Sequence, residues 1–198
     1  MGEITKLLRQ RVSVRNYQNK PVPQSVLDDI LEAGRLSPSG GNEQAYRFGV
    51  ITDRGLIAKI AQLAHHQDWI AQAPLLIVLC TAFVEDARGA RVIQMQRFPE
   101  AAGAIAAMDA DLYHALNQEE HQTKIAGTHM ALAALEHGVG SCWVSRFEVM
   151  PLADLLHLPQ NVLPSEILVF GYPEGQSKRT SKKSLGELVF FNAWQRRE

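Results

Sequence analysis

Apolar residues along the chain follow two spacings, one typical of helices and one typical of buried strands. Helical spacing predicts helices over 4–10, 26–34, 56–64 and 119–137, and a short one over 152–156. Strand-like runs occur at 47–52, 74–81, 141–145 and 166–170. The run 74–81 is almost continuously apolar, as expected for a central strand that is covered on both faces. Strands separated by helices and long connections predict an α+β protein whose sheet carries helices on its faces.

Two segments are not assigned by this pattern. Residues 84–101 fit neither spacing, and they are either a mobile lid or a pair of short helices. Residues 188–191, Leu-Val-Phe-Phe, are apolar although they lie close to the end of the chain. This segment either wraps onto a partner subunit or covers the protein's own sheet. The long helix before Gly138 is expected to end there, because glycine is favoured just past a helix C-terminus.

Composition narrows the class of protein. The chain has 198 residues, of which 46% are hydrophobic and 21% charged, which predicts a single domain over 1–198. Twenty Lys and Arg residues against 21 Asp and Glu residues argue against a nucleic-acid or anionic-membrane binder. The longest apolar run, 75–80, is far too short to span a bilayer. Two cysteines, Cys80 and Cys142, do not make a disulfide framework, so a reducing cytoplasm is expected.

The distribution of charge is more informative than its total. Residues 1–20 hold five cations against one carboxylate, and residues 178–183 hold four cations and no carboxylate. Two basic segments at opposite ends of an otherwise acidic chain either converge on one small anion or are solvated surface. Charge alone favours the solvated surface.

Several common functional motifs are absent from the sequence. There is no glycine-rich phosphate loop followed by lysine, and Gly138-Val139-Gly140 is not completed by a third glycine because position 143 is Trp. No CxxC, HExxH or GxSxG occurs, and the seven histidines have no recognisable ligand spacing. A histidine-based metallohydrolase is therefore disfavoured, and no metal site is expected.

The first stretch with candidate chemistry is Arg11-Val12-Ser13-Val14-Arg15. If it is extended, Arg11, Ser13 and Arg15 share one face and both valines the other. Two guanidinium groups around a hydroxyl suit a phosphate monoester, because forked N–H donors match its oxygens. The alternative, a half-exposed strand with polar residues facing water, is somewhat favoured by the pattern alone.

Three further stretches offer hydrogen-bonding groups for a planar heterocycle. Residues 37–48 form a glycine-rich turn whose Ser39 and Asn42 suit a ring edge, or they form an ordinary Asx or Ser turn. The amide of Gln67 offers a donor and an acceptor together, which matches an imide. The predicted strand 141–145 ends where backbone N–H groups can face a ring nitrogen and carbonyl. Within it, Cys142 is more typical of a small buried residue than of a nucleophile.

Taken in order, these four stretches resemble the FMN-dependent nitroreductase and flavin reductase family. The resemblance spans nearly the whole chain, through 163–166 and 170–173 to the basic tail. It implies a nitroreductase-like α+β fold with a central mixed β-sheet covered by helices, in a homodimer with FMN at the interface. Departures from the family pattern are Ala45-Tyr46 after Gln44, where Pro-Trp is usual, and Lys182 where the family has Arg.

The resemblance also implies roles for individual residues. Arg11 and Ser13 would hold the FMN phosphate, and Arg15 would lie near the phosphate or the N1/C2=O edge of the ring. A loop of the partner chain would contact the same flavin, Gln67 would bond the pyrimidine edge, and backbone groups after the strand 141–145 would face N5 and O4. The implied cofactor-binding set is Arg11, Val12, Ser13, Arg15, Pro38, Ser39, Gly40, Asn42, Gln67, Val144, Ser145, Arg146 and Lys182 or its neighbour Lys183.

The implied activity is hydride transfer by a ping-pong mechanism. NADH or NADPH reduces the flavin, and a nitroaromatic, quinone, free flavin or activated alkene reoxidises it, so no catalytic side chain is expected. No residue distinguishes NADH from NADPH. Two alternatives stay open: a non-catalytic flavin-binding module that acts as a sensor or store, and another FMN chemistry of the family, such as deiodination or flavin fragmentation.

Overall fold

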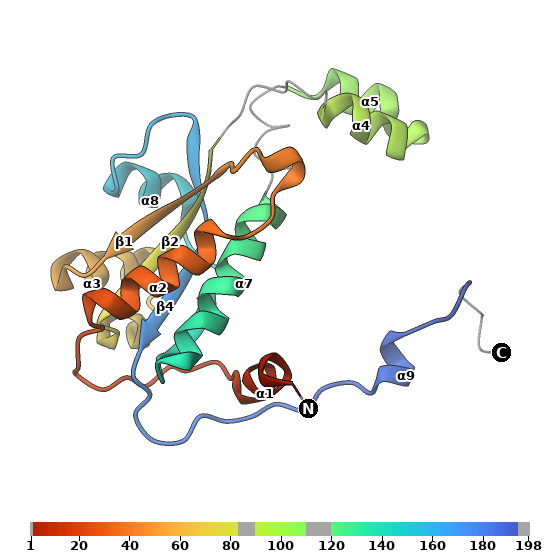
Figure 1. The fold of residues 1–198 in the computed structure, drawn as a ribbon. Helices are drawn as coiled ribbons and strands as arrows, with labels where there is room; N and C mark the ends of the chain where they lie inside the picture. Colours follow the sequence, from red (N-terminus) through yellow and green to blue (C-terminus); the bar gives the residue numbers. More distant parts are fainter. Residues whose placement is uncertain (1, 83–89, 110–119, 194–198) are drawn as a thin grey trace.

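The computed structural model describes residues 2–82, 90–109 and 120–193. Its centre is a four-stranded sheet in the order β1-β2-β4-β3, formed by β1 (Tyr46–Ile51), β2 (Leu75–Ala82), β3 (Gly140–Val144) and β4 (Val162–Gly171). All four strands lie where the apolar pattern predicts them, and β4 begins four residues earlier. The α+β class is therefore confirmed (Figure 1).

A central sheet with both parallel and antiparallel strands was expected, but the observed sheet is almost entirely antiparallel. All three pairs of neighbouring strands are antiparallel. Parallel pairing in the described residues is limited to a single bridge between Ser13 and Ser141. The sheet lacks a full parallel strand because the N-terminal segment pairs with the edge strand β3 through this one bridge.

Helices form at the positions that the spacing predicts. The long helix α7 ends as expected before Gly138, which has a φ of +70° and so suits glycine. The helices on the sheet are α2 (Gln24–Arg35), α3 (Arg54–Leu63), α7 (Glu120–Glu136) and α8 (Val149–Leu155), with 3₁₀ turns η1 (Gly40–Asn42) and η2 (Asp68–Gln72). The N-terminal helix α1 (Glu3–Gln10) lies against α7.

Strand β2 is buried on both faces, as its continuous apolar run predicts. Leu75, Ile77 and Leu79 pack with α2 and α7 on one face. Leu76 and Val78 pack with α3 and α8 on the other. The close packing of α7 on the sheet depends on Gly127, since a Cβ there would lie 2.4 Å from Leu79 Cδ1. Alternation along one strand thus produces two hydrophobic layers.

An extended N-terminal segment, residues 11–19, lies along one edge of this sheet and is hydrogen-bonded both to β3 and to the segment that follows β4. The Val14 N–H donates to the Ser141 carbonyl at 3.0 Å, and the Gln18 N–H donates to the Tyr172 carbonyl at 2.9 Å. The approach is close enough that a Cβ at Gly140 would lie 2.5 Å from Val14 Cγ2. Residues 13–18 are therefore fixed beside β3 and the segment that follows β4.

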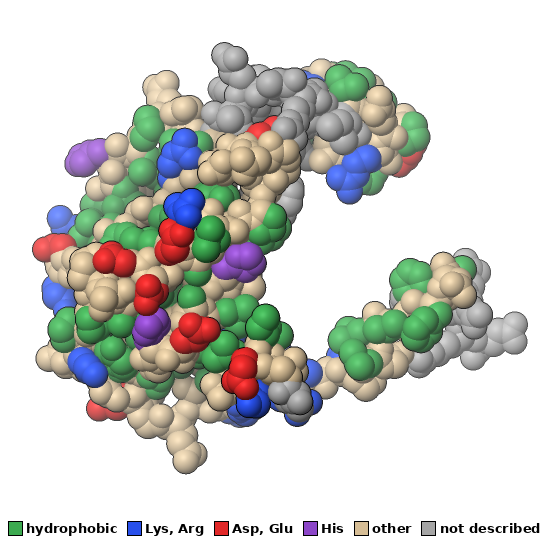
Figure 2. Space-filling view, in the orientation of Figure 1, with side chains coloured by type: hydrophobic (Ala, Val, Ile, Leu, Met, Phe, Trp, Pro, Cys, Tyr) green, Lys and Arg blue, Asp and Glu red, His purple; other side chains and the backbone are tan. Residues whose placement is uncertain are grey.

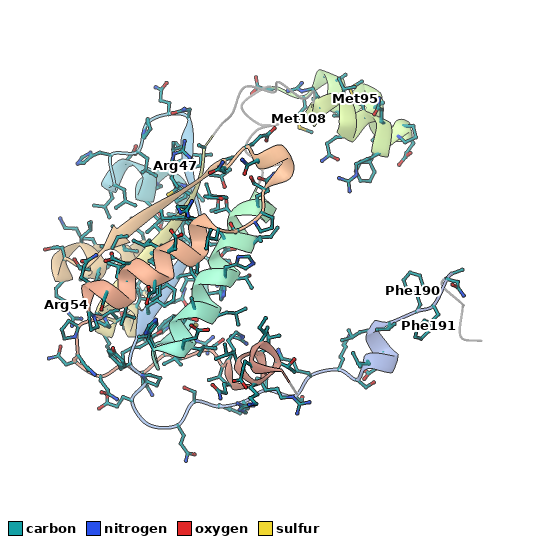
Figure 3. All side chains as sticks on the ribbon, in the orientation of Figure 1. Arg47, Arg54, Met95, Met108, Phe190 and Phe191 are labelled. Carbon is teal, nitrogen blue, oxygen red and sulfur yellow. The ribbon has the colours of Figure 1, made fainter. Side chains whose placement is uncertain are left out.

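Two parts extend away from this body (Figure 1). One is a helical hairpin of α4 (Ala90–Arg97), the turn η3 (Pro99–Ala101) and α5 (Ala102–Ala107), so the described part of the unassigned stretch 84–101 is helical; residues 84–89 lie outside the described residues. The other, here called the C-terminal arm, is residues 184–193 with α9 (Leu185–Leu188). Figure 3 places Phe190 and Phe191 on the arm and off the sheet, so this segment does not cover its own sheet. No helix in the described ranges is long and apolar enough to cross a membrane.

Candidate functional site

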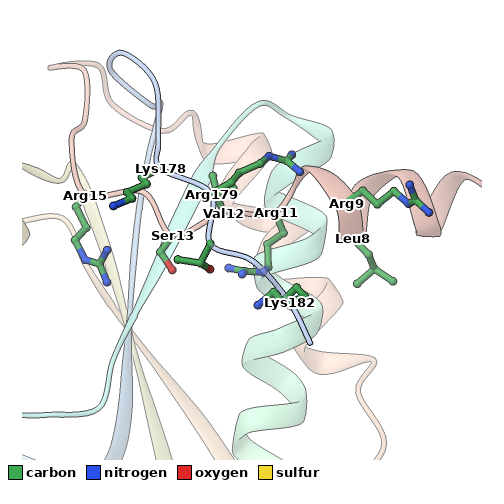
Figure 4. Close-up of a pocket in the computed structure, with 10 residues that line it drawn as sticks. Leu8, Arg9, Arg11, Val12, Ser13, Arg15, Lys178, Arg179 and Lys182 are labelled. Carbon is green, nitrogen blue, oxygen red and sulfur yellow. The ribbon is translucent and has the colours of Figure 1, made fainter. Parts of the chain in front are cut away.

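Both basic segments of the sequence line one pocket, here called the basic pocket (Figure 4). Its volume is about 380 Å³. The last turn of α1 and the extended segment form one side, and the segment after β4 forms the other. The lining residues are Leu8, Arg9, Arg11, Val12, Ser13, Arg15, Lys178, Arg179, Thr180 and Lys182. The two charged segments therefore converge in the fold, although the side chains of Arg9, Arg15, Lys178, Arg179 and Lys182 stay exposed to solvent.

The chemistry of this pocket favours an anion. Six of its ten lining residues are Arg or Lys, and none of the ten is acidic. Within the described part of the chain, none of the six pairs with a carboxylate. Arginine forks and lysine ammonium groups around a hydroxyl match the oxygens of a phosphate.

The segment from Arg11 to Arg15 has the alternation that the sequence predicts. Val14 is 3% exposed and belongs to the core, and Val12 packs against the same core. Arg11, Ser13 and Arg15 line the pocket, as does Val12. The bridge to Ser141 and the burial of Val14 hold this geometry, whereas the half-buried Val12 both packs against the core and lines the pocket.

Gln67 and Arg146 lie together, although 79 positions separate them in the sequence. The Gln67 Nε2 donates to the Ala64 carbonyl at 2.9 Å and approaches the Arg146 carbonyl at 3.5 Å. The Arg15 guanidinium carbon lies 5.6 Å from the centre of the Trp69 ring, which links this corner to the basic pocket. Because the Gln67 amide nitrogen is engaged by backbone carbonyls, Oε1 is the atom through which it can accept an N–H from a ring.

A buried carboxylate supports the end of β3, and the sequence predicts no role for it. Ser145, which follows the last strand residue Val144, donates from Oγ to Glu166 Oε2 at 2.6 Å. Glu166 is 3% exposed, and its Oε1 lies 3.2 Å from Lys124 Nζ. The only sequence signal was a glutamate inside an otherwise apolar run. Its contacts show that it fixes the Ser145 side chain at the strand end.

A chain of buried hydroxyl groups lies next to this carboxylate. Thr81 Oγ1 is 2.8 Å from Thr123 Oγ1 and 2.7 Å from Ser165 Oγ. These three hydroxyls join β2, α7 and β4, and two of them directly precede charged residues in the sequence, Thr123 before Lys124 and Ser165 before Glu166. The polar corner of the core is thus satisfied internally, as buried polar groups require.

The loop with Pro38, Ser39, Gly40 and Asn42 does not reach the basic pocket in its own chain. It lies by the N-terminal end of α7, where a Cβ on Gly40 would meet the Gln122 side chain at 2.9 Å. The helix α1, which carries Arg9, lies at the opposite end of α7 (Figure 1). Inside the loop, Ser39 Oγ accepts the Gln44 N–H at 3.0 Å, so its side chain is bonded to the backbone of its own loop.

The structure also distinguishes the two lysines of the basic tail. Lys182 lines the basic pocket, whereas Lys183 is exposed and is not among the lining residues. Lys178, Arg179 and Arg9 line it as well, although the family resemblance gave them no role. Only the count of charges in the two basic segments pointed to these three residues.

Comparison with known proteins adds an independent observation. The family model described as "Nitroreductase family" matches residues 8–172. The chain belongs to this family. It is 31% identical over 187 residues to an FMN reductase [NAD(P)H] of Bacillus subtilis, covering 90% of this chain and 69% of that one. It is 26% identical over 180 residues to a putative NADH dehydrogenase/NAD(P)H nitroreductase of Archaeoglobus fulgidus, covering 89% and 88%.

Solved structures agree with this nitroreductase-family fold. The hypothetical oxidoreductase YcnD of Bacillus subtilis superposes with a TM-score of 0.80 at 25% identity, over 99% of this chain and 76% of that one. NfrA2 of B. megaterium gives the same TM-score at 23% identity, over 98% and 76%. The expected nitroreductase-like fold is confirmed.

In the described residues, neither a cysteine nucleophile nor a metal site is supported. Burial raises the pKa of the Cys80 thiol to about 12. Burial also raises the pKa of Cys142, although Arg15, a hydrogen bond from Ser13 and Arg11 oppose the rise. Neither cysteine is therefore a thiolate nucleophile near neutral pH. Among the residues described, no group of three His, Cys, Asp or Glu side chains is arranged to hold a metal ion.

The burial of both thiols leads to a direct prediction. The native protein at about pH 8 is expected to resist alkylation by iodoacetamide, because both pKa values lie above the usual thiol value. Denatured protein should take up two equivalents, one at each cysteine. Counting the adducts by mass spectrometry checks this, and rapid labelling of one thiol in the native protein would contradict it.

Proposed function

We propose that this chain is an FMN-dependent oxidoreductase that transfers a hydride from NADH or NADPH to a small acceptor. The observation that carries the proposal is the convergence of both basic segments on one pocket in a member of the nitroreductase family. The name of the Bacillus subtilis relative, an FMN reductase [NAD(P)H], supports the same cofactor and donor. Acceptors of the proposed reaction are nitroaromatics, quinones, free flavins and activated alkenes.

The residues present fit FMN. Arg11, Ser13 and Lys182 line the basic pocket, where they would hold a phosphate monoester. Arg15 lines this pocket next to Trp69, where its positive charge would stabilise an anionic ring edge. Bound FMN supplies a ring that takes up a hydride and gives it to the acceptor, so no side chain needs to act as a nucleophile.

The end of β3 is proposed to orient the ring. Backbone groups of Val144, Ser145 and Arg146 would face its N5 and O4 edge, and the Gln67 Oε1 would accept from its imide N–H. Two contacts support rigidity here: the 2.6 Å bond from Ser145 to Glu166 and the approach of Gln67 to the Arg146 carbonyl. A site held by buried partners loses little entropy when the ring binds.

We also propose that the protein works as a homodimer in the cytoplasm. Pro38, Ser39, Gly40 and Asn42 lie too far from the basic pocket of their own chain to share its flavin, and a second copy would supply them. The C-terminal arm supports this arrangement, because Leu185 is 78% exposed and Phe191 82% exposed. Figure 2 shows these hydrophobic side chains gathered on the arm, where a partner chain would bury them. Two buried free cysteines suit a reducing compartment.

The alternatives within the family have weaker support. Iodotyrosine deiodinases match only 34% of this chain, as in the rat enzyme at 31% identity over 68 residues. A flavin-binding module that does not turn over would use the same binding residues. Only a measurement of turnover distinguishes it from the enzyme.

The cofactor assignment is tested first. Purified protein should release about one FMN per chain on heating. Arg11→Gln should weaken FMN binding by about 2 kcal/mol, or roughly thirtyfold, because a charge-assisted bond to phosphate is lost. Lys59→Gln, which removes an exposed charge on α3, should bind like the wild type. Titration followed by flavin fluorescence checks both variants, and a protein that takes up no FMN would overturn the assignment.

Turnover is tested on the FMN-loaded protein. Anaerobic NADH or NADPH should bleach the visible absorbance of the flavin, and a later addition of a quinone should restore it. Stopped-flow absorbance measures both half-reactions. A flavin that stays oxidised with both donors would favour the binding module over the enzyme.

The dimer is tested on the C-terminal arm. The wild type should sediment at twice the 22.0 kDa chain mass. The double variant Phe190→Ser/Phe191→Ser should shift toward the monomer, because it removes apolar area that the partner would bury. Val50→Ser, at a partly exposed position on β1, serves as the control and should leave the mass unchanged. Sedimentation equilibrium measures all three, and a monomeric wild type would contradict the proposal.

A further inference from the structure

The buried carboxylate of Glu166 lies directly across the sheet from the end of β3. The last backbone pair between β3 and β4 joins Val144 to Ile167, so the antiparallel register places Ser145 opposite Glu166 at the next position. Ser145 Oγ lies 2.6 Å from Glu166 Oε2, and Glu166 is 3% exposed. The side chains therefore continue the pairing of the two strands one position beyond the backbone ladder.

The second oxygen of this carboxylate has a partner as well. Glu166 Oε1 lies 3.2 Å from Lys124 Nζ on α7, and the nearby hydroxyls of Thr81, Thr123 and Ser165 bond one another. The ion pair identifies Glu166 as a carboxylate, and a carboxylate has hydrogen-bond acceptors only. In the 2.6 Å bond the Ser145 hydroxyl must therefore be the donor.

The bond to Glu166 decides what Ser145 can offer to a ligand. A hydroxyl that donates its single proton keeps only lone pairs for other partners. Among the described residues, Ser145 Oγ has no hydrogen-bond partner besides Glu166, and Ser145 is exposed. The end of β3 therefore presents a side-chain acceptor, and a buried group on the neighbouring strand imposes that direction.

We propose that Glu166 is a positioning residue that sets the direction of a hydrogen bond between Ser145 and the flavin ring. This inference rests on the proposed function, in which residues 144–146 face the N5 and O4 edge of bound FMN. The oxidised ring has no N–H at N5 and the reduced ring has one, so an acceptor at this edge favours the reduced ring. Glu166 thereby makes the bound cofactor easier to reduce without touching it.

The substitution Glu166→Gln reverses the direction of this bond with almost no change of shape. The Lys124 ammonium has donors only, so the new carbonyl oxygen turns to it and the new amide NH₂ turns to Ser145. Ser145 then directs its own proton toward the ring, which favours the oxidised ring. Loss of the negative charge acts in the opposite sense, because it favours an anionic reduced ring. The same substitution in a Ser145→Ala background has only the effect of charge, so the comparison separates the two effects.

The experiment measures the midpoint potential of FMN bound to the full-length protein, by anaerobic titration against a reference dye. The variants are Ser145→Ala, Glu166→Gln and the double variant. Glu32→Gln, which removes a carboxylate paired with Arg35 on α2, is the matched control. Flavin fluorescence gives the affinity for oxidised FMN as a second readout.

Ser145→Ala is expected to lower the potential, because the acceptor for the reduced ring is lost. The effect of Glu166→Gln alone should be more negative than its effect in the Ser145→Ala background. The expected difference is about tenfold in the ratio of reduced to oxidised affinity, or about 30 mV for a two-electron couple. Glu32→Gln should change neither the potential nor the affinity. A role in the fold alone would weaken both oxidation states of FMN equally and leave the potential unchanged.

Two results would overturn the role of Glu166: equal effects of Glu166→Gln in the two backgrounds, or a potential that does not fall with Ser145→Ala. The second result requires no change at Glu166, so the inference is tested even if Glu166→Gln does not fold. A wild type that takes up no FMN is a separate result, because it overturns the proposed function and removes this inference with it.

Discussion

The pairing of the extended N-terminal segment with the sheet edge is the interaction on which the site depends. A few backbone hydrogen bonds, including Val14 to Ser141 and Gln18 to Tyr172, fix residues 11–19 between β3 and the chain that leaves β4. The buried side chain of Val14 anchors the segment to the core, so its arginines face outward. Without this pairing, the two basic segments are 160 residues apart and have no reason to meet. One short edge contact therefore turns two surface charge clusters into one pocket.

The helices and strands could be predicted from the sequence because burial of one face makes apolar residues recur at a regular spacing. The run at 74–81 predicted a strand covered on both faces, and β2 has that environment. The alternation of Arg11 to Arg15 predicted which side chains share a face. Contacts between segments that are far apart in the sequence leave no such spacing of residues. For that reason the sequence could not show that Arg9 and Arg179 line the same pocket, or that the sheet is almost wholly antiparallel.

The partners of isolated polar residues could not be predicted from the sequence either. Glu166 stands at the start of the predicted strand 166–170, and only the three-dimensional structure shows its partners, Ser145 and Lys124. Gln67 was singled out for its amide, but its nitrogen proves to be engaged by the protein's own backbone. In the candidate loop, Ser39 and Asn42 belong to a local turn far from the pocket, so residue type alone could not say which chain they serve.

The position of Lys182 has a thermodynamic consequence. It lines the basic pocket and lies three residues before α9, the first helix of the C-terminal arm. A ligand that immobilises Lys182 also restricts the starting point of the arm, and so removes part of the conformational entropy that the arm would lose on docking. Such coupling is reciprocal: whatever strengthens docking of the arm must strengthen anion binding by the same factor. Occupancy of the pocket and association of subunits would then form a single linked equilibrium.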